Sequence, residues 1–160
     1  MERARGESAQ RRAPVTLAVI DTGVFVAGIY WRNEPHQILR GVALGLFRPV
    51  LTEPLFEEYI RAAWRLRERE RMLPEPVAWL ETFQKSGRWV SPVLLREAVC
   101  RDGKDDKFIE AALGAQCRLI VARDKDLTVL EKPFGISILT PRTFLATLSR
   151  FERRRLISGR

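Results

Sequence analysis

The sequence is short of the residues on which several kinds of chemistry depend. Its 160 residues include one histidine, His36, and two cysteines, Cys100 and Cys117. Two cysteines exclude a disulfide framework, and together with a single histidine they nearly exclude a Cys/His zinc site. A Ser or Cys nucleophile activated by histidine is excluded unless His36 serves as its base. Any catalysis by this chain must therefore depend mostly on carboxylates.

Long apolar runs are also missing. The longest, residues 15–20 and 41–47, are far shorter than the ~20 residues that span a bilayer. Residues 1–14 contain no apolar stretch and do not form a secretory signal. We therefore expect a cytoplasmic protein without membrane contact, and 160 residues suit about one domain.

The net charge of +8 is concentrated at the two ends of the chain. Residues 1–14 carry +2 and residues 150–160 carry +4, which leaves +2 for residues 15–149. We expect a basic, flexible N-terminal tail over 1–14, one domain over 15–149 and a basic C-terminal tail over 150–160. Such tails either bind phosphate nonspecifically or act as solubilising ends, so the charge alone supports a nucleic-acid partner only weakly.

An internal basic run follows Glu57 and Glu58 and contains five arginines. They are Arg61, Arg65, Arg67, Arg69 and Arg71. The run has two interpretations. It is either a solvated helix face with ion pairs to Glu68 and Glu70, or a surface that contacts phosphate. In the second case Arg61 and Arg65 are the candidate RNA contacts.

Short apolar runs alternate with segments of helical periodicity. The predicted strands are residues 15–20, 49–51, 89–90, 118–122 and 136–139. Helices are predicted over 34–47, from an N-cap at Thr52, from Pro74 or Pro76 to Gly87, from Asp105 or Asp106 to Ala115, in a short segment ending at Leu130, and from Thr140 through Phe151. This alternation predicts an α/β fold with a parallel sheet.

Acidic residues follow the predicted strands or open the next helix. They are Asp21, the pair Glu57 and Glu58, the pair Asp105 and Asp106, and the pair Asp124 and Asp126. In a parallel sheet these groups lie at one edge, where ligands of open α/β sheets bind. Each could instead cap a helix, although Asp21, at the end of a buried strand, needs a partner to offset its desolvation.

Clustered carboxylates repel one another unless a cation lies between them. Hard divalent ions such as Mg²⁺ or Mn²⁺ take oxygen ligands. One such ion, or two about 4 Å apart, would activate water for hydrolysis of a phosphodiester without any histidine, serine or cysteine nucleophile. The sequence therefore predicts metal-assisted phosphodiester hydrolysis.

Five segments, taken in order, resemble a known family. They are VIDTGVFVAGIY, LTEPLFEEYIRAA, CRDGKDDKFIEAAL, LIVARDKDLTVL and ILTPRTFLATL. Together they cover about residues 16–148 and are similar to PIN-domain proteins, most specifically the VapC-like toxins of toxin–antitoxin systems. The resemblance implies a three-layer α/β/α sandwich around a parallel sheet of about five strands. It also implies a Mg²⁺- or Mn²⁺-dependent endoribonuclease with an RNA substrate and an antitoxin partner.

The resemblance assigns the four acids of the family to this chain. They match Asp21, Glu58, Asp106 and Asp124, with Glu57 as the alternative to Glu58 in register. Asp21 and Asp106 are expected as the central metal ligands, with Asp124 completing the metal site and Glu58 ligating or orienting water. Thr22, Asp105 and Asp126 are expected as supporting residues.

The chain departs from the family pattern beside two of these acids. Gly23 stands where the family usually has Asn, and Ala122-Arg123 stand where it usually has Thr-Gly. Losing such neighbouring hydrogen-bond groups can change metal affinity ~10–100-fold. Arg123 would then contact RNA phosphate or pair with Asp124. A second hypothesis is thus a catalytically weakened PIN fold that binds nucleic acid or another protein.

Two further expectations concern partners and alternatives. Apolar residues on the helices that begin near Glu53 and Pro74 suggest a homodimer, and Trp31 beside Tyr30 is a candidate for stacking on an RNA base. A phosphatase or phospho-receiver domain also uses acids at strand ends, but the segment after Asp21 lacks the DxD spacing expected for it.

Overall fold

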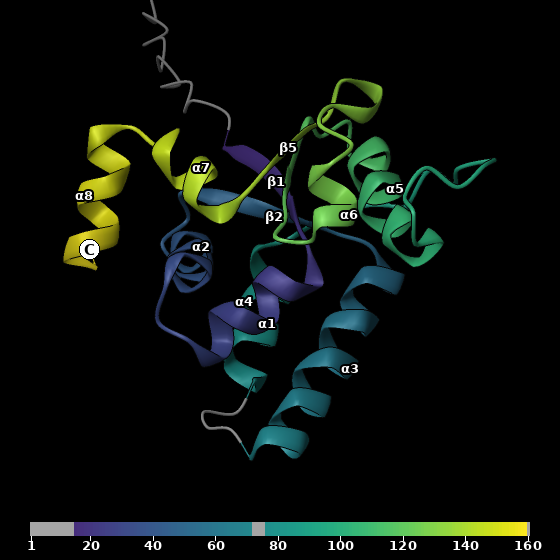
Figure 1. Ribbon diagram of the computed structural model, residues 1–160. Coiled ribbons are helices and arrows are strands. Elements are labelled where there is room, and N and C mark those ends of the chain that lie inside the picture. Colours follow the sequence, from purple (N-terminus) through teal and green to yellow (C-terminus); the bar gives the residue numbers. More distant parts are fainter. Residues whose placement is uncertain (1–14, 72–75, 160) are drawn as a thin grey trace, which may run out of the picture.

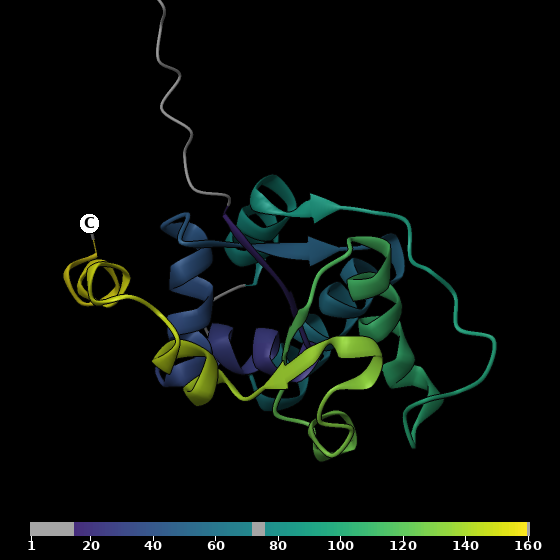
Figure 2. The ribbon, with the colours of Figure 1, turned by 90° about the horizontal axis from the view of Figure 1, so that it is seen from above.

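The fold is built around a parallel sheet of five strands, with helices on both faces (Figures 1 and 2). The computed structural model describes residues 15–71 and 76–159, so the predicted tail over 1–14 lies outside the described residues. The strands are β1 (Thr16–Ile20), β2 (Phe47–Leu51), β3 (Arg88–Trp89), β4 (Leu119–Val121) and β5 (Ser137–Leu139), in the order β3-β2-β1-β4-β5. The three-layer α/β/α sandwich with a five-stranded parallel sheet is confirmed.

The strand order determines which face each helix covers. Parallel crossovers are right-handed, so connections that run toward β3 and those that run toward β5 lie on opposite faces. One face carries α1 (Thr22–Tyr30), α2 (Glu34–Ala43), α3 (Glu53–Glu70) and α4 (Val77–Ser86). The other carries α5 (Asp106–Gly114), which packs on β1, β2 and β4, and the short α6 (Lys125–Thr128). No helix of the described residues is long and apolar enough to cross a membrane.

Helix α1 begins directly where β1 ends. Asp21 is its N-cap, and the carboxylate accepts a hydrogen bond of 2.7 Å from the backbone N–H of Val24. Periodicity gives no sign of this helix, because every residue from Val24 to Ile29 is buried and a helix enclosed on nearly all sides has no polar face. The tight strand-to-helix junction fixes Asp21 at the edge of the sheet.

Helix α3 is attached to the same edge by Tyr59. Thr52 caps its start, as predicted, and accepts a hydrogen bond from the N–H of Leu55. The fully buried Tyr59 stacks on Phe25 of α1 at 4.4 Å between ring centroids, and its hydroxyl donates to the carbonyl of Ile20 at the end of β1. These contacts place the neighbouring residue, Glu58, beside Asp21.

The C-terminal segment differs from the sequence expectation. Instead of one helix followed by a tail, it forms two helices, α7 (Pro141–Ala146) and α8 (Arg150–Ser158). Helix α8 begins with a capping box, in which the side chains of Ser149 and Glu152 each accept a hydrogen bond from the other residue's N–H. Helix α8 contacts α2, and Leu156 is buried. Residues 150–158, expected as a tail, are therefore helical, and the Ser-x-x-Glu pattern is the sequence signal for this break.

Close packing at the end of α5 gives a stability prediction. A Cβ added at Gly114 would lie 2.1 Å from the carbonyl oxygen of Ser91, which belongs to the backbone and cannot rotate away. We expect Gly114→Ala to lower the free energy of unfolding by about 3 kcal/mol, measured by urea denaturation. In the control Gly103→Ala, whose Cβ would come no closer than 4.0 Å to a neighbour, the change should be below about 1 kcal/mol. Equal effects of the two substitutions would contradict this packing.

Candidate metal and nucleic-acid site

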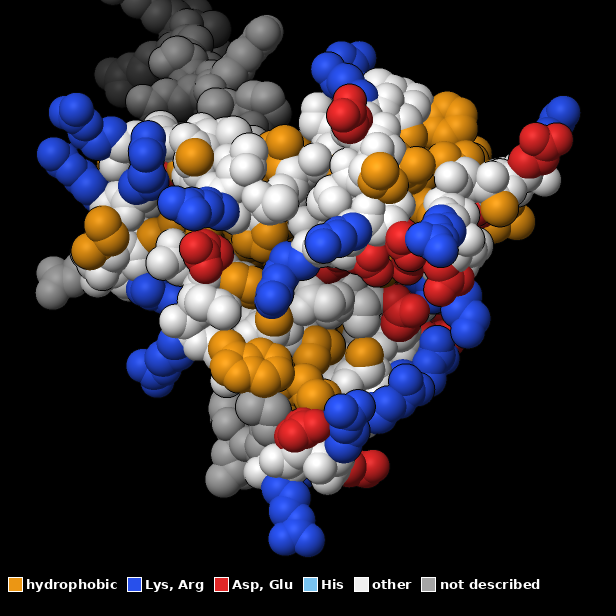
Figure 3. Space-filling view, viewed as in Figure 1, with side chains coloured by type: hydrophobic (Ala, Val, Ile, Leu, Met, Phe, Trp, Pro, Cys, Tyr) orange, Lys and Arg blue, Asp and Glu red, His pale blue; other side chains and the backbone are white. Residues whose placement is uncertain are grey.

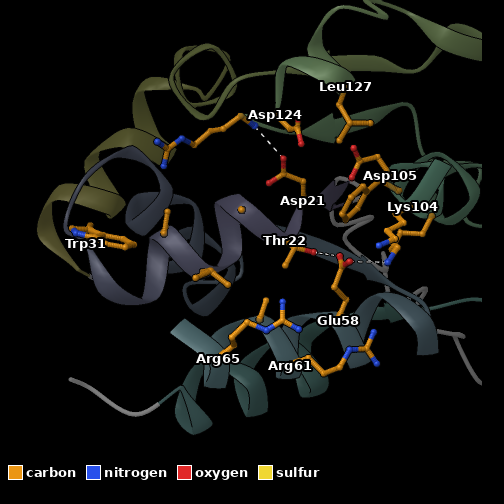
Figure 4. Close-up of a pocket in the computed structure, with 17 residues that line it drawn as sticks. Asp21, Thr22, Trp31, Glu58, Arg61, Arg65, Lys104, Asp105, Asp124 and Leu127 are labelled. Atoms are coloured by element: carbon orange, nitrogen blue, oxygen red, sulfur yellow. Dashed lines mark hydrogen bonds and ion pairs between the residues drawn. The ribbon is translucent and has the colours of Figure 1, made fainter. Parts of the chain in front are cut away.

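A pocket of about 970 Å³ lies at the carboxyl ends of β1 and β4, against α3 and the start of α5 (Figure 4). Its carboxylates come from four separate segments of the chain. They belong to Asp21, Glu58, Asp105 and Asp124. The expected gathering of acids at one edge of the sheet is thus present, but Asp105 rather than Asp106 supplies the third carboxylate.

Asp21 is the most deeply buried of these acids. Its two carboxylate oxygens accept hydrogen bonds from the N–H groups of Val24 at 2.7 Å and Arg123 at 3.1 Å. Burial raises the pKa of Asp21 to about 6, and the nearby Asp124 carboxylate adds to the rise, although the backbone hydrogen bonds oppose it. A carboxylate held so unfavourably at neutral pH is one that a cation would stabilise.

Three further aspartates form a close group next to Asp21. One carboxylate oxygen from each of Asp105, Asp124 and Asp126 lies within 4.8 Å of the others. Asp124 caps α6 by accepting a hydrogen bond of 2.8 Å from the N–H of Asp126, and that cap fixes its orientation. The pKa of Asp105 is raised to about 6, first by burial and then by repulsion from Asp124 and other nearby acids. The group concentrates negative charge at one point.

The two candidate acids of α3 point in different directions. Glu58 faces the pocket, where it accepts a hydrogen bond from the Thr22 hydroxyl and pairs with Lys107 at 2.7 Å. The side chain of Glu57 is 58% exposed and lies 4.0 Å from Arg61, with which it pairs on the helix surface. Glu58 therefore lines the pocket in contact with Thr22, whereas Glu57 does not line it.

Asp106, expected as a central metal ligand, does not line the pocket. Its buried carboxylate accepts hydrogen bonds from the backbone N–H groups of Cys100 at 2.7 Å and Val99 at 3.1 Å. The preceding turn of 3₁₀-helix, Gly103–Asp105, directs Asp105 into the pocket instead. The sequence contains a signal for this: Asp106 lies three residues before the buried Ile109 and so shares the inward face of α5.

Basic side chains surround the acids. Arg61 and Arg65 of α3, Arg123 before α6, and Lys104 and Lys107 near the start of α5 all line the pocket. Figure 3 shows Asp and Glu side chains gathered at one place with Lys and Arg side chains around them. Farther along α3, Arg69 pairs with Glu70 at 3.0 Å. Two arginines of the basic run thus line the pocket, and another forms an ion pair within the helix.

Trp31 marks the end of the pocket away from the acids (Figure 4). Its side chain is 45% exposed and lies edge-on to Tyr30, at 6.2 Å between ring centroids. Arg123 lines this pocket and also a second pocket of about 230 Å³, which Arg142 lines as well. The cavity therefore joins an acidic end to an end with aromatic and cationic side chains.

The donor set fits a hard divalent cation. The candidate ligands are carboxylate oxygens, which Mg²⁺ and Mn²⁺ prefer, and Asp105, Asp124 and Asp126 bring oxygens close enough to surround one ion. No nitrogen or sulfur ligand among the described residues belongs to this group. The sequence patterns did not place Lys104 or Lys107 in the pocket. They also did not predict helix α1, which begins at Thr22.

Comparison with known proteins identifies a family for this chain. A family model described as PIN domain matches residues 17–126, about two thirds of the chain. The matched region contains all four carboxylates of the pocket. No curated protein and no solved structure matches the chain.

Proposed function

The chain belongs to the PIN-domain family, whose members are generally nucleases, and we propose on this premise that it is a Mg²⁺- or Mn²⁺-dependent endoribonuclease. The observation that carries the proposal is the convergence of Asp21, Glu58, Asp105 and Asp124 in one pocket rimmed by arginine and lysine. Acids suit a divalent cation, and the basic rim suits the phosphates of an RNA strand.

Within this proposal, Asp21, Asp105 and Asp124 hold the cation, and Asp126 supports them. A bound Mg²⁺ or Mn²⁺ would supply positive charge at the scissile phosphate and make water a stronger nucleophile. The N–H groups of Val24 and Arg123 fix the Asp21 carboxylate, and the cap on α6 fixes Asp124. Such orientation of the ligands by neighbouring groups is a requirement for a working metal centre.

The RNA strand would run from the acids toward Trp31. Arg61 and Arg65 lie along this path (Figure 4), and Arg123 also lines the pocket, so several cationic side chains are available to contact the phosphates. The exposed Trp31 ring would stack on an unpaired base. These contacts favour a single strand, because stacking requires a base that is free of its partner.

Arg65→Gln tests this path. We expect it to weaken binding of single-stranded RNA about fivefold, and to reduce the slope of log affinity against log salt by about 0.7, the value for one phosphate contact. Binding is measured by fluorescence anisotropy without divalent cations, so that the RNA stays intact. In the control Arg69→Gln, one turn farther along α3 and paired with Glu70, the slope should not change. Equal effects of the two substitutions would remove Arg65 from the path.

Incubation of the protein with single-stranded RNA and Mn²⁺ tests the proposed activity. We expect internal cleavage of RNA that stops on addition of EDTA and is absent in Asp21→Asn, with little cleavage of DNA of the same sequence. Cleavage that persists in Asp21→Asn would contradict the proposal. RNA binding without cleavage, under any divalent cation, would favour the alternative of a catalytically weakened nucleic-acid-binding module.

We further propose that the enzyme is the toxin of a toxin–antitoxin pair and acts in the cytoplasm with an antitoxin protein as partner. The support is the resemblance of the five sequence segments to VapC-like toxins. Induced expression should arrest growth, and Asp21→Asn should relieve the arrest. A homodimer is a separate expectation, which draws on exposed apolar residues such as Ile60 of α3 and Val77 of α4 and is tested by sedimentation.

A further inference from the structure

Glu58 differs from the other acids of the pocket in having a cationic partner. The Lys107 ammonium lies 2.7 Å from one of its carboxylate oxygens, and the Thr22 hydroxyl donates to the other. The side chains of Lys107 and Glu58 are 22% and 27% exposed, so the pair is largely shielded from solvent. Both oxygens of Glu58 are thus occupied by groups of the protein itself.

The aspartates have no such partner. Across residues 15–71 and 76–159, no Lys or Arg side chain pairs with Asp105, Asp124 or Asp126. Among the described residues, the negative charge of Glu58 is therefore paired with the Lys107 ammonium, whereas the charges of these three aspartates are not paired with a basic side chain.

The local structure explains why Lys107 reaches Glu58. Asp106 and Lys107 are successive residues of α5, and successive side chains of a helix point about 100° apart. Since Asp106 is fixed on the N–H groups of Val99 and Cys100, Lys107 is turned toward α3, which contacts α5. The ion pair connects these two helices across the pocket.

From this arrangement we infer that Lys107 takes the place of a second metal ion. The site binds one divalent cation, at Asp21, Asp105 and Asp124, and the Lys107 ammonium on Glu58 is the second fixed positive charge that faces the substrate phosphate. The inference rests on the proposed function, since it concerns the cation of that same site. Lys107 is accordingly a positioning residue for Glu58 and a contact for the phosphodiester.

Counting bound Mn²⁺ by isothermal titration calorimetry and electron paramagnetic resonance tests the inference without any measurement of activity. The wild-type protein should bind one Mn²⁺ per chain. Glu58→Gln should still bind one, with an affinity changed by less than about threefold, whereas Asp105→Asn should weaken binding by at least about tenfold. Lys107→Met frees the Glu58 carboxylate and should admit a second, weaker ion.

Lys104→Met is the matched control, because it removes the same charge from the same pocket while Lys104 pairs with no acid of the described residues. It should keep the count at one. Lys107→Gln repeats the test should Lys107→Met fail to fold, which thermal unfolding reveals.

Two ions in the wild type, one of them lost in Glu58→Gln, would overturn the inference and leave the proposed nuclease intact. A count that stays at one in both folded Lys107 variants would also overturn the inference. Absence of Mn²⁺ binding to the wild type would instead overturn the proposed function, and the inference with it.

Discussion

Asp105→Asn is expected to reduce RNA hydrolysis by about 100-fold or more and to leave the stability of the metal-free protein nearly unchanged or slightly higher. The carboxylate faces the pocket and one of its oxygens lies within 4.8 Å of those of Asp124 and Asp126. Its neutralisation removes a ligand and also relieves repulsion between the acids. Burial, and after it this repulsion, raise the pKa of Asp105 to about 6. Initial cleavage rates and urea denaturation in EDTA measure the two effects.

The neighbouring substitution Asp106→Ala should behave in the opposite way. It removes the buried acceptor of the N–H groups of Val99 and Cys100, so the free energy of unfolding should fall by about 3 kcal/mol. Activity should fall only as far as the loosened turn displaces Asp105, and Asp106→Asn, which keeps one acceptor oxygen, should recover part of the stability. An Asp106→Ala protein of normal stability that neither binds Mn²⁺ nor cleaves RNA would make Asp106 the ligand after all.

Asp21→Asn is expected to abolish cleavage and to stabilise the metal-free protein at pH 8 by about 2 kcal/mol. Burial raises the pKa of Asp21 from 3.8 to about 6. The unfolded chain ionises this group near pH 4 and the folded chain near pH 6, so wild-type stability falls as the pH rises through this window and stays low above it. Asparagine avoids this cost because it stays neutral, and its side-chain oxygen can still cap α1.

Urea denaturation in EDTA at pH 4 and pH 8 checks the effect of Asp21→Asn. The advantage of the variant should be small at pH 4 and full at pH 8. Mn²⁺ at about 100 times its dissociation constant should stabilise the wild type by about 2.7 kcal/mol and the variant by much less. A variant less stable than the wild type at pH 8 in EDTA would contradict the conclusion that the ionised Asp21 carboxylate destabilises the metal-free protein.

The parts of the fold with strong local patterns could be predicted from the sequence. Apolar runs bounded by polar residues identified the five strands, and Thr52 and Thr140 identified two helix starts, because strand burial and N-caps are local properties. Helix α1 was missed because its residues are buried on nearly every side, so the pattern of its apolar residues has no helical period.

The site was harder to predict where adjacent residues compete for one role. Family resemblance selected Asp106, but the direction of a side chain at a helix start depends on the preceding turn, here a turn of 3₁₀-helix that a motif does not encode. Glu58 and Glu57 present the same choice, and Glu58 lines the pocket because the buried Tyr59 next to it fixes the register of α3. The ion pair of Lys107 with Glu58 could not be predicted, because the two residues are 49 positions apart in the sequence.

The central claim is that acids from separate segments of the chain hold a divalent cation at the edge of the sheet. A crystal structure of the protein grown with Mn²⁺, with anomalous scattering to locate the ion, tests it most directly. We predict Mn²⁺ bound by carboxylate oxygens of Asp21, Asp105 and Asp124, with the Asp106 carboxylate still accepting hydrogen bonds from the N–H groups of Val99 and Cys100. A pocket without an ion at saturating Mn²⁺, or an ion bound through Asp106 with Asp105 turned away, would contradict it.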